Sequence, residues 1–266
     1  ANAGQTRNTK MSGQIINTPA LYKDVKKIAI LGVSVAFTSR DGAGSKGDNG
    51  YGGIPLEHFN ELAESELQSI YKGFEMEGFS VVKLEEVMKA PSYSKLDFGQ
   101  WDQGLRYSEN CWIVTPQNSK WLEPDIVNSV SSGISLVHAD TLKARAMKRN
   151  KPFQDIVKEV NADAGVNIVL RYYVYDNEVK MGWTPLKRGM VVDMIPVSGD
   201  PRIVWSATLK SDLEIGVEIE KFDKKSNLYS KTWKLNLQPS IPKLSDATMQ
   251  VMSAAAVQLK MDQAEE

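Results

Sequence analysis

The sequence has little of what disulfide frameworks, metal sites and acid–base catalysis need. Its single cysteine, Cys111, excludes an internal disulfide framework and a zinc site built from several cysteines. Its two histidines, His58 and His138, leave little material for histidine-based catalysis or metal binding. No catalytic motif is specific enough to name a reaction. We therefore expect a protein that is not an enzyme and that holds no cofactor and no metal.

The sequence also lacks an excess of charge and a long apolar run. The formal net charge of the 266 residues is -1, which argues against a broad basic surface and against bulk binding of nucleic acid. No apolar run approaches the roughly 20 residues that span a bilayer, so we expect no transmembrane helix. Hydrophobic residues make up 42% of the chain, which is enough to bury a sizeable core.

The first apolar stretch indicates the fold class. Residues 26–37 form an almost continuous apolar run, which predicts a strand buried on both faces of a sheet. A glycine-rich insert at 40–53 follows, then an amphipathic helix that begins near Pro55, then a short apolar strand at 79–82. This order is a strand–helix–strand crossover, the elementary unit of an α/β domain.

The predicted helix after the insert has one apolar face. Its members recur at spacings of three and four residues: Phe59, Leu62, Ala63, Leu67, Ile70 and Phe74. The acidic residues Glu57, Glu61, Glu64 and Glu66 are expected to fall mostly away from that face, and His58 is expected to be solvated.

The rest of the chain alternates between strand and helix patterns. A short helix is expected at 84–88, a strand at 111–115 that buries Cys111, and a helix that starts at Pro152 and ends near Gly165. A strand is expected at 168–175, a hairpin at 190–197 and 202–209, a second hairpin at 213–237, and a helix at 248–260 capped by Ser245 or Asp246. The predicted fold class is therefore α/β, a mixed sheet flanked by helices with an additional β-hairpin. We expect a flexible arm at 1–20 and one domain at 21–266 that contains the insert 40–53 and an irregular aromatic segment at 91–125.

Several of these stretches together resemble a known family. They are KKIAILGVSVAF at 26–37, GFSVV at 78–82, NADAGVNIVLRYYVY at 161–175 and VVDMIPVSGDPRIVWSATL at 191–209. This set is similar to the periplasmic α/β domain of the curli-export lipoprotein family and of the amino-terminal domain of TolB-type proteins. The resemblance implies an envelope location, oligomeric assembly and no chemistry, and it supplies no catalytic residue. The insert at 40–53 and the tryptophan-rich segment at 91–125 depart from the family pattern.

The glycine-rich insert is a candidate binding segment. Its six glycines allow backbone amides to converge on an anion, and its carboxylate and amide oxygens suit calcium. The candidate ligand-binding residues are Arg40, Asp41, Gly44, Lys46, Asp48 and Asn49. The spacing matches neither a P-loop nor an EF-hand. A flexible surface loop explains the same composition.

The aromatic segment is a candidate for stacking against sugar rings. The residues that would stack are Tyr93, Trp101, Trp112 and Trp121. Because aromatic side chains bury large areas, packing of the segment onto the sheet is the alternative. A basic run near 141–151, with Lys143, Arg145, Lys148, Arg149 and Lys151, is expected to be a solvated helix face, and a docking patch for an acidic partner is the alternative.

These patterns favour a non-enzymatic secreted or periplasmic envelope protein. It would act in assembly or secretion through self-association or by docking to an outer-membrane partner, using the strand at 213–220, the basic run and the glycine-rich insert. Ala1-Asn2-Ala3 has the small–x–small pattern of a signal-peptidase site, and residues left by cloning explain it equally well. The alternatives are an α/β ligand-binding protein or enzyme that uses the 40–53 loop for an anionic group, and a glycan-binding module.

Overall fold

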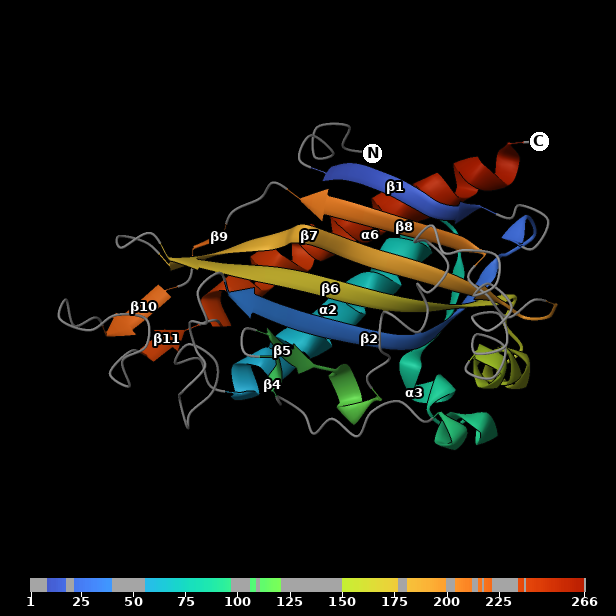
Figure 1. Ribbon diagram of the computed structural model, residues 1–266, viewed down its shortest axis with the longest axis horizontal. Coiled ribbons are helices and arrows are strands. Elements are labelled where there is room, and N and C mark those ends of the chain that lie inside the picture. The colour runs from blue at the N-terminus through green and yellow to red at the C-terminus, as the bar shows by residue number, and fades with distance from the viewer. Residues whose placement is uncertain are drawn as a thin grey trace, which may run out of the picture.

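The computed structural model of the chain (Figure 1) describes twelve stretches of it. They are residues 9–17, 22–39, 56–96, 106–108, 111–120, 150–176, 181–199, 204–211, 215–216, 218–221, 234–236 and 238–265.

The described elements alternate between strands and helices along the chain. The strands are β1 (Thr9–Asn17), β2 (Lys27–Ser39), β3 (Ser80–Val82), β4 (Arg106–Ser108), β5 (Cys111–Val114), β6 (Ala164–Asp176), β7 (Met181–Pro196), β8 (Trp205–Ser211), β9 (Ile215–Gly216), β10 (Glu218–Lys221) and β11 (Lys234–Asn236). The α-helices are α2 (Leu56–Met76), α3 (Leu84–Val87), a helix at 150–159 and α6 (Ile241–Ala264), and short 3₁₀ turns lie at Pro91–Lys95, Pro116–Asn118 and Gln238–Ser240.

One mixed sheet organises the molecule. Its strand order in the described part of the chain is β1-β8-β7-β6-β2-β5-β4, with β3 beside β2 and β9 beside β7. The pairs β2–β3 and β2–β6 are parallel, and the remaining pairs are antiparallel. With helices on both sides of this sheet, the α/β fold class predicted from the sequence is confirmed.

The connections explain why helices cover both faces. Ile28 of β2 pairs with β3 on one edge and with β6 on the other, so the two parallel neighbours lie on opposite sides of β2. Connections between parallel strands are almost always right-handed. When two right-handed crossovers lead to strands on opposite sides of β2, their helices lie on opposite faces of the sheet. Accordingly, α2 packs in the cluster on one face and the helix at 150–159 packs in the cluster on the other.

Strand β2 contributes side chains to both hydrophobic clusters. One cluster lies under α2 and α6, and the other lies under the helix at 150–159, while α3 contributes Leu84 to the first cluster and Val87 to the second. An extra residue in β2 shifts its register against β6 between Ile30 and Gly32, which moves the alternation by one position. The sequence prediction of a strand buried on both faces is confirmed, and the residues of β2 that face α2 and α6 are exposed by 1% or less: Ile28, Ile30, Val33 and Val35.

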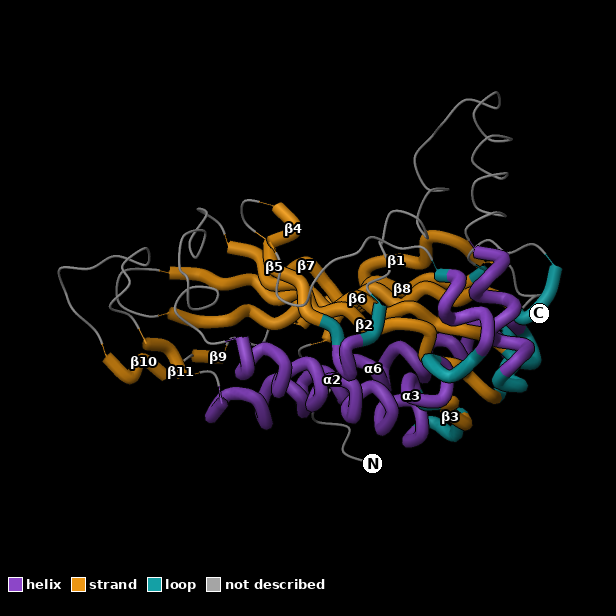
Figure 2. Tube along the Cα trace, turned by 90° about the horizontal axis from the view of Figure 1, so that it is seen from below, coloured by secondary structure: helices purple, strands orange, loops and turns teal. Residues whose placement is uncertain are grey.

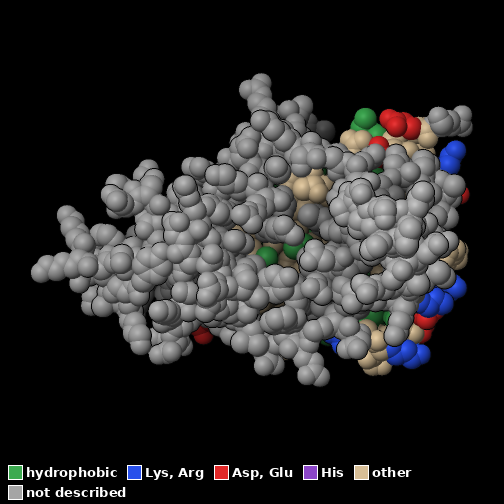
Figure 3. Space-filling model, in the orientation of Figure 1, with side chains coloured by type: hydrophobic (Ala, Val, Ile, Leu, Met, Phe, Trp, Pro, Cys, Tyr) green, Lys and Arg blue, Asp and Glu red, His purple; other side chains and the backbone are tan. Residues whose placement is uncertain are grey.

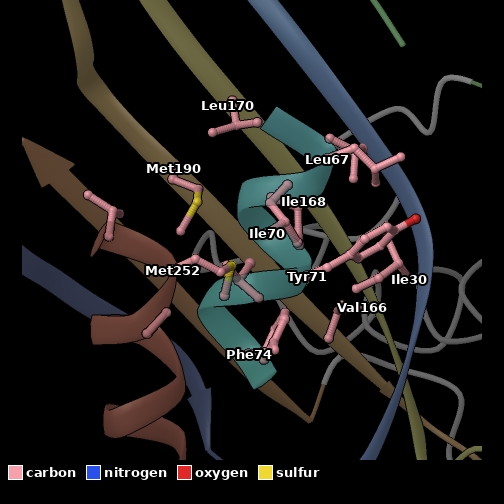
Figure 4. Packing of buried hydrophobic residues seen from close by; sticks show 14 of the residues in the cluster. Ile30, Leu67, Ile70, Tyr71, Phe74, Val166, Ile168, Leu170, Met190 and Met252 are labelled. Carbon is pink, nitrogen blue, oxygen red and sulfur yellow. The ribbon is translucent and has the colours of Figure 1, made fainter. Parts of the chain in front are cut away.

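Helices α2 and α6 form one layer against the first face of the sheet (Figure 2). They run parallel, because contacts between them advance together along both chains, from Ser65–Ser245 to Glu77–Ser253. In the core beneath them, Ile70 and Phe74 of α2 lie among side chains from the sheet, with Met252 of α6 beside them (Figure 4). The apolar face predicted for α2 is therefore the face that is buried.

The helix at 150–159 ends at an asparagine instead of at the predicted Gly165. Asn161 takes a positive φ of 53°, the Asn161 N–H donates to the Lys158 carbonyl, and the Ala162 N–H donates to the Val157 carbonyl. This is the Schellman arrangement. Gly165 lies inside β6, where a Cβ would come within 2.5 Å of Leu31 Cδ1. Glycine is needed at this position because Leu31 leaves no room for a side chain.

Three further predictions about element boundaries need correction. The expected flexible arm at 1–20 contains β1, which pairs antiparallel with β8 at the edge of the sheet. Helix α6 begins at Ile241, ahead of the predicted start, because Pro242 in its first turn suits a helix start, so Ser245 and Asp246 lie inside the helix. The strand expected at 213–220 is divided between β9, which pairs with β7, and β10, which pairs with β11 as the predicted hairpin requires.

The approach of α2 to α6 depends on Gly73. A Cβ at this position would lie 2.6 Å from Met252 Cβ and 3.1 Å from the Met249 carbonyl oxygen. These atoms belong to the backbone and the base of a side chain, so they cannot move aside without shifting α6.

We expect Gly73→Ala to destabilise the protein by about 1–3 kcal/mol, because overpacking costs that much in a tight core. Helix propensity alone would stabilise the variant by about 1 kcal/mol. Thermal and urea unfolding measure the change, and Lys72→Ala on the exposed side of the same helix should stay within about 0.5 kcal/mol of the wild type. A more stable Gly73→Ala protein would show that the two helices are not in close contact.

Candidate functional site

Most of the residues predicted to bind a ligand lie outside the described residues. These are the six residues of the glycine-rich insert from Arg40 to Asn49, together with Trp101 and Trp121. His138 and the basic run up to Arg149, which were not predicted to bind a ligand, also lie outside the described residues. Trp112 and Cys111 lie in β5, in agreement with the strand predicted there, but the orientation of their side chains is not described. The ligand-binding role of the insert therefore stays a prediction.

Tyr93 is part of the core. Its side chain belongs to the second cluster and is 7% exposed. Its hydroxyl accepts a hydrogen bond of 2.8 Å from the Lys120 N–H, while the Lys120 ammonium donates to the carbonyls of Tyr93, Ser94 and Leu96. Tyr93 thus holds residue 120 against the 3₁₀ turn at Pro91–Lys95, as the packing alternative requires, and its ring is not open to a sugar.

Two polar residues of α2 are buried against expectation. His58 is 9% exposed, although the sequence suggested a solvated side chain. Glu66 is completely buried and lies on the face of α2 that meets the sheet. Its position was readable from spacing, since it is four residues after Leu62 and four before Ile70, both of which are in the core.

Glu66 joins three elements through hydroxyl groups. The Tyr172 hydroxyl of β6 donates to Glu66 Oε1, and Thr248 of α6 lies beside the same carboxyl. Burial raises the pKa of Glu66 to about 8, and the Thr248 and Tyr172 hydroxyls offset part of this rise. Burial and the neighbouring Glu66 also raise the pKa of Tyr172 well above its usual value. Glu66 is therefore mostly protonated at neutral pH.

Two other buried carboxyls form hydrogen bonds between different elements of the fold. Asp262 of α6 accepts a hydrogen bond of 2.7 Å from Trp205 Nε1 of β8 and one of 2.8 Å from Gln258. On the other face of the sheet, Asp193 of β7 accepts a hydrogen bond of 2.5 Å from the Ser206 hydroxyl of β8. Glu66, Asp262 and Asp193 thus each join a different set of elements.

Asn167 extends the polar row that begins with Asp193 and Ser206. It stands opposite Asp193 in the pairing of β6 with β7, and it is 1% exposed. Neither its side-chain nitrogen nor its oxygen has a hydrogen-bond partner within the described stretches. The row places polar side chains on the second face of the sheet, beyond the apolar cluster around Leu31.

Among the described residues, no group of three or more His, Cys, Asp and Glu side chains is placed so that it could hold a metal ion. Within the same ranges, no helix combines the length and the apolar character that crossing a bilayer requires.

The surface at the α3 end of the molecule carries charges of both signs. Figure 3, which views the face with the second cluster, shows Lys and acidic side chains together at this end. The exposed residues there are Lys83, Glu85, Glu86, Lys89, Lys95, Lys158 and Glu159. Such an intermixed surface is typical of a face that contacts water.

The outer face of α6 is different. No charged residue lies between Asp246 and Lys260, a distance of more than three helical turns. Large hydrophobic side chains remain exposed at Met76 (63%), Val257 (40%) and Met261 (54%). We call these three residues the apolar patch.

The members of the apolar patch lie near one another at the ends of the two helices. Glu77 follows Met76 and accepts a hydrogen bond of 2.8 Å from the Ser253 hydroxyl. Its carbonyl accepts another, of 3.0 Å, from Lys260 Nζ. Since Ser253 and Lys260 stand one turn before and one turn after Val257, these bonds bring the end of α2 next to Val257.

Comparison with known proteins gives little beyond these observations. No protein-family model and no curated protein matches the chain. Among solved structures, the chain is similar to the PelC dodecamer from Paraburkholderia phytofirmans, with 12% identity, a TM-score of 0.35 and coverage of 97% of this chain and 99% of that one. A variant of the same dodecamer gives 12% identity, a TM-score of 0.32 and coverage of 92% and 94%. Similarity at this level is too low to assign a function.

We expect Glu66→Gln to stabilise the protein in alkaline solution. A carboxyl whose pKa rises from 4.5 to about 8 on folding gives its full stability below pH 4.5, and that stability is lost as the pH rises toward 8. The variant should have a flatter pH dependence and gain about 2–4 kcal/mol at pH 8 relative to the wild type.

Unfolding by urea between pH 5 and pH 9 measures this difference. Glu75→Gln, on the exposed side of α2, is the matched control and should keep the pH dependence of the wild type. If Glu66→Gln were less stable than the wild type at pH 8, Glu66 would be ionised and favourably paired in the fold.

Proposed function

We propose that this chain is a non-enzymatic secreted or periplasmic envelope protein that acts in assembly or secretion by associating with other proteins. The association is with copies of itself or with an outer-membrane partner. The observation that carries the proposal is the outer face of α6, which is uncharged between Asp246 and Lys260, together with the exposed apolar patch that Val257 and Met261 of α6 form with Met76 of α2. A surface helix normally places charged residues on its solvent side, and an exposed apolar patch bordered by polar residues is typical of an interaction site.

The internal polar groups support the same proposal. The buried carboxyls Glu66 and Asp262 are occupied with joining α2, β6, α6 and β8, and both are 3% exposed or less. These carboxyls therefore hold the fold together, which agrees with a protein that acts by presenting its surface to partners. The resemblance to the curli-export and TolB-type α/β domain is part of this proposal and would account for an envelope location.

Replacing Val257 with glutamate should weaken the association without unfolding the chain. A charge at an exposed position costs little in the monomer but must lose its water in an interface. We expect the Val257→Glu protein to sediment more slowly than the wild-type oligomer, or to be lost from the outer-membrane fraction in cell fractionation. The melting temperature of the variant should stay within about 2 °C of that of the wild type.

Gln68→Glu is the matched control, since it adds the same charge at an exposed position of α2 away from the apolar patch. It should leave both measurements unchanged. A wild-type protein that sediments as a monomer and stays in the soluble cell fraction would overturn the proposed function.

A further inference from the structure

We propose that α6 binds α6 of a second copy of this chain, with the two helices antiparallel and crossing at Ser253 and Ala254. The inference rests on the self-association part of the proposed function and names its surface. It is drawn from the spacing of exposed residues on α6, from the small residues at its centre and from the charges at its two ends.

The exposed residues of α6 form one continuous stripe. Its members recur at spacings of four and three residues and are exposed or half-exposed: Asp246, Gln250, Ser253, Val257, Lys260 and Ala264. Apolar or uncharged residues at this spacing form the seam along which two helices pack. The opposite side of α6 is already used, because Leu244, Val251 and Leu259 are buried in the core.

The middle of the stripe allows close contact. Ser253 and Ala254 are small and half-exposed, and helix axes can approach more closely where the side chains at the crossing are small. Val257 stands one turn after this point and Met249 one turn before it, so a second helix crossing here would cover the apolar side chains on both sides.

The charges at the ends of the stripe select the antiparallel direction. In a parallel pair, Lys243 would meet Lys243 of the second copy and Asp246 would meet Asp246, which is unfavourable. In an antiparallel pair, Lys243 meets Glu265 and Asp246 meets Lys260, because the members of each pair lie about equally far from the crossing. All four residues are exposed. A two-fold axis repeats each attraction, so the dimer has two of each pair.

Local bonds leave these charged groups able to reach a partner. Asp246 accepts a hydrogen bond of 2.9 Å from Gln250 in the same helix, and a carboxylate has further acceptor sites. Lys260 donates one hydrogen bond to the Glu77 carbonyl and keeps two other donors on the same ammonium.

Disulfide trapping tests the direction of the pair. One full-length protein carries Asp246→Cys and a second, made larger by a tag, carries Lys260→Cys. After mixing and mild oxidation, we expect a covalent heterodimer on a non-reducing gel. Each variant oxidised alone should give at least about tenfold less homodimer, because identical positions lie at opposite ends of an antiparallel pair. These single-variant samples also contain the native Cys111 and so control for its reaction.

Charge reversal provides a second test in solution. Lys243→Glu should weaken self-association about tenfold in sedimentation equilibrium, since two attractions become repulsions. Adding Glu265→Lys in the same chain should restore the affinity to within about threefold of the wild type. Melting temperatures near that of the wild type confirm that these surface variants remain folded.

The outcomes separate this inference from the proposed function. Trapping by each variant alone would show a parallel pair and overturn the proposal. An oligomer that gives no heterodimer, or one that is insensitive to Lys243→Glu, would place the interface elsewhere and overturn it while leaving self-association standing. A wild type that is monomeric at all concentrations would overturn both this inference and the self-association part of the proposed function, leaving only docking to another partner.

Discussion

The burial of β2 on both faces is the constraint on which the rest of the fold depends. Its side chains enter two clusters, so the sheet must be covered twice, once by α2 with α6 and once by the helix at 150–159. The parallel pairing of β2 with β3 and with β6 supplies the two crossovers that deliver these helices. Strict alternation after Ile30 would place Gly32 on the first face of the sheet. The extra residue at Leu31 shifts the alternation by one position, so Val33 and not Gly32 follows Ile30 on that face.

The helix layer on the first face depends on a small number of buried contacts that tolerate little change. Gly73 allows α2 to approach α6, and the buried Glu66 connects both helices to Tyr172 of the sheet. A buried carboxyl is unfavourable unless it is protonated, so the layer is most stable in acidic solution, and this stability is lost as the pH rises from 4.5 toward 8. Holding α6 in this way leaves one side of it buried and the other, uncharged side facing outward.

Strong periodicity made part of the fold predictable. The β2 run, the apolar face of α2 and the β7–β8 hairpin follow from the spacing of large apolar residues, because each such residue must leave water. Strand β1 was missed, since an edge strand is recruited by backbone pairing with β8 and needs little apolar alternation. Gly165 was misread because the sequence does not show that Leu31 and Val157 close over it.

The candidate site was less accessible to sequence reasoning than the fold. Glu66 was assigned to the polar side of α2 on its residue type, although its spacing from Leu62 and Ile70 places it in the core. Tyr93 was a candidate for stacking, yet its hydroxyl and ring are used by Lys120, a contact between residues distant in sequence. The outer face of α6 could have been found from the absence of charge between Asp246 and Lys260, once the helix was known to extend to both residues.

The outer face of α6 is proposed here as the surface through which the protein associates. Hydrogen exchange of the full chain, followed by mass spectrometry at low and high protein concentration, can show whether this surface becomes covered on association. We expect amide exchange between Asp246 and Lys260 to slow as the protein concentration rises, while exchange in α3 and in the helix at 150–159 stays the same. Slower exchange confined to other elements, or exchange in α6 that does not change while the protein associates, would contradict the proposal.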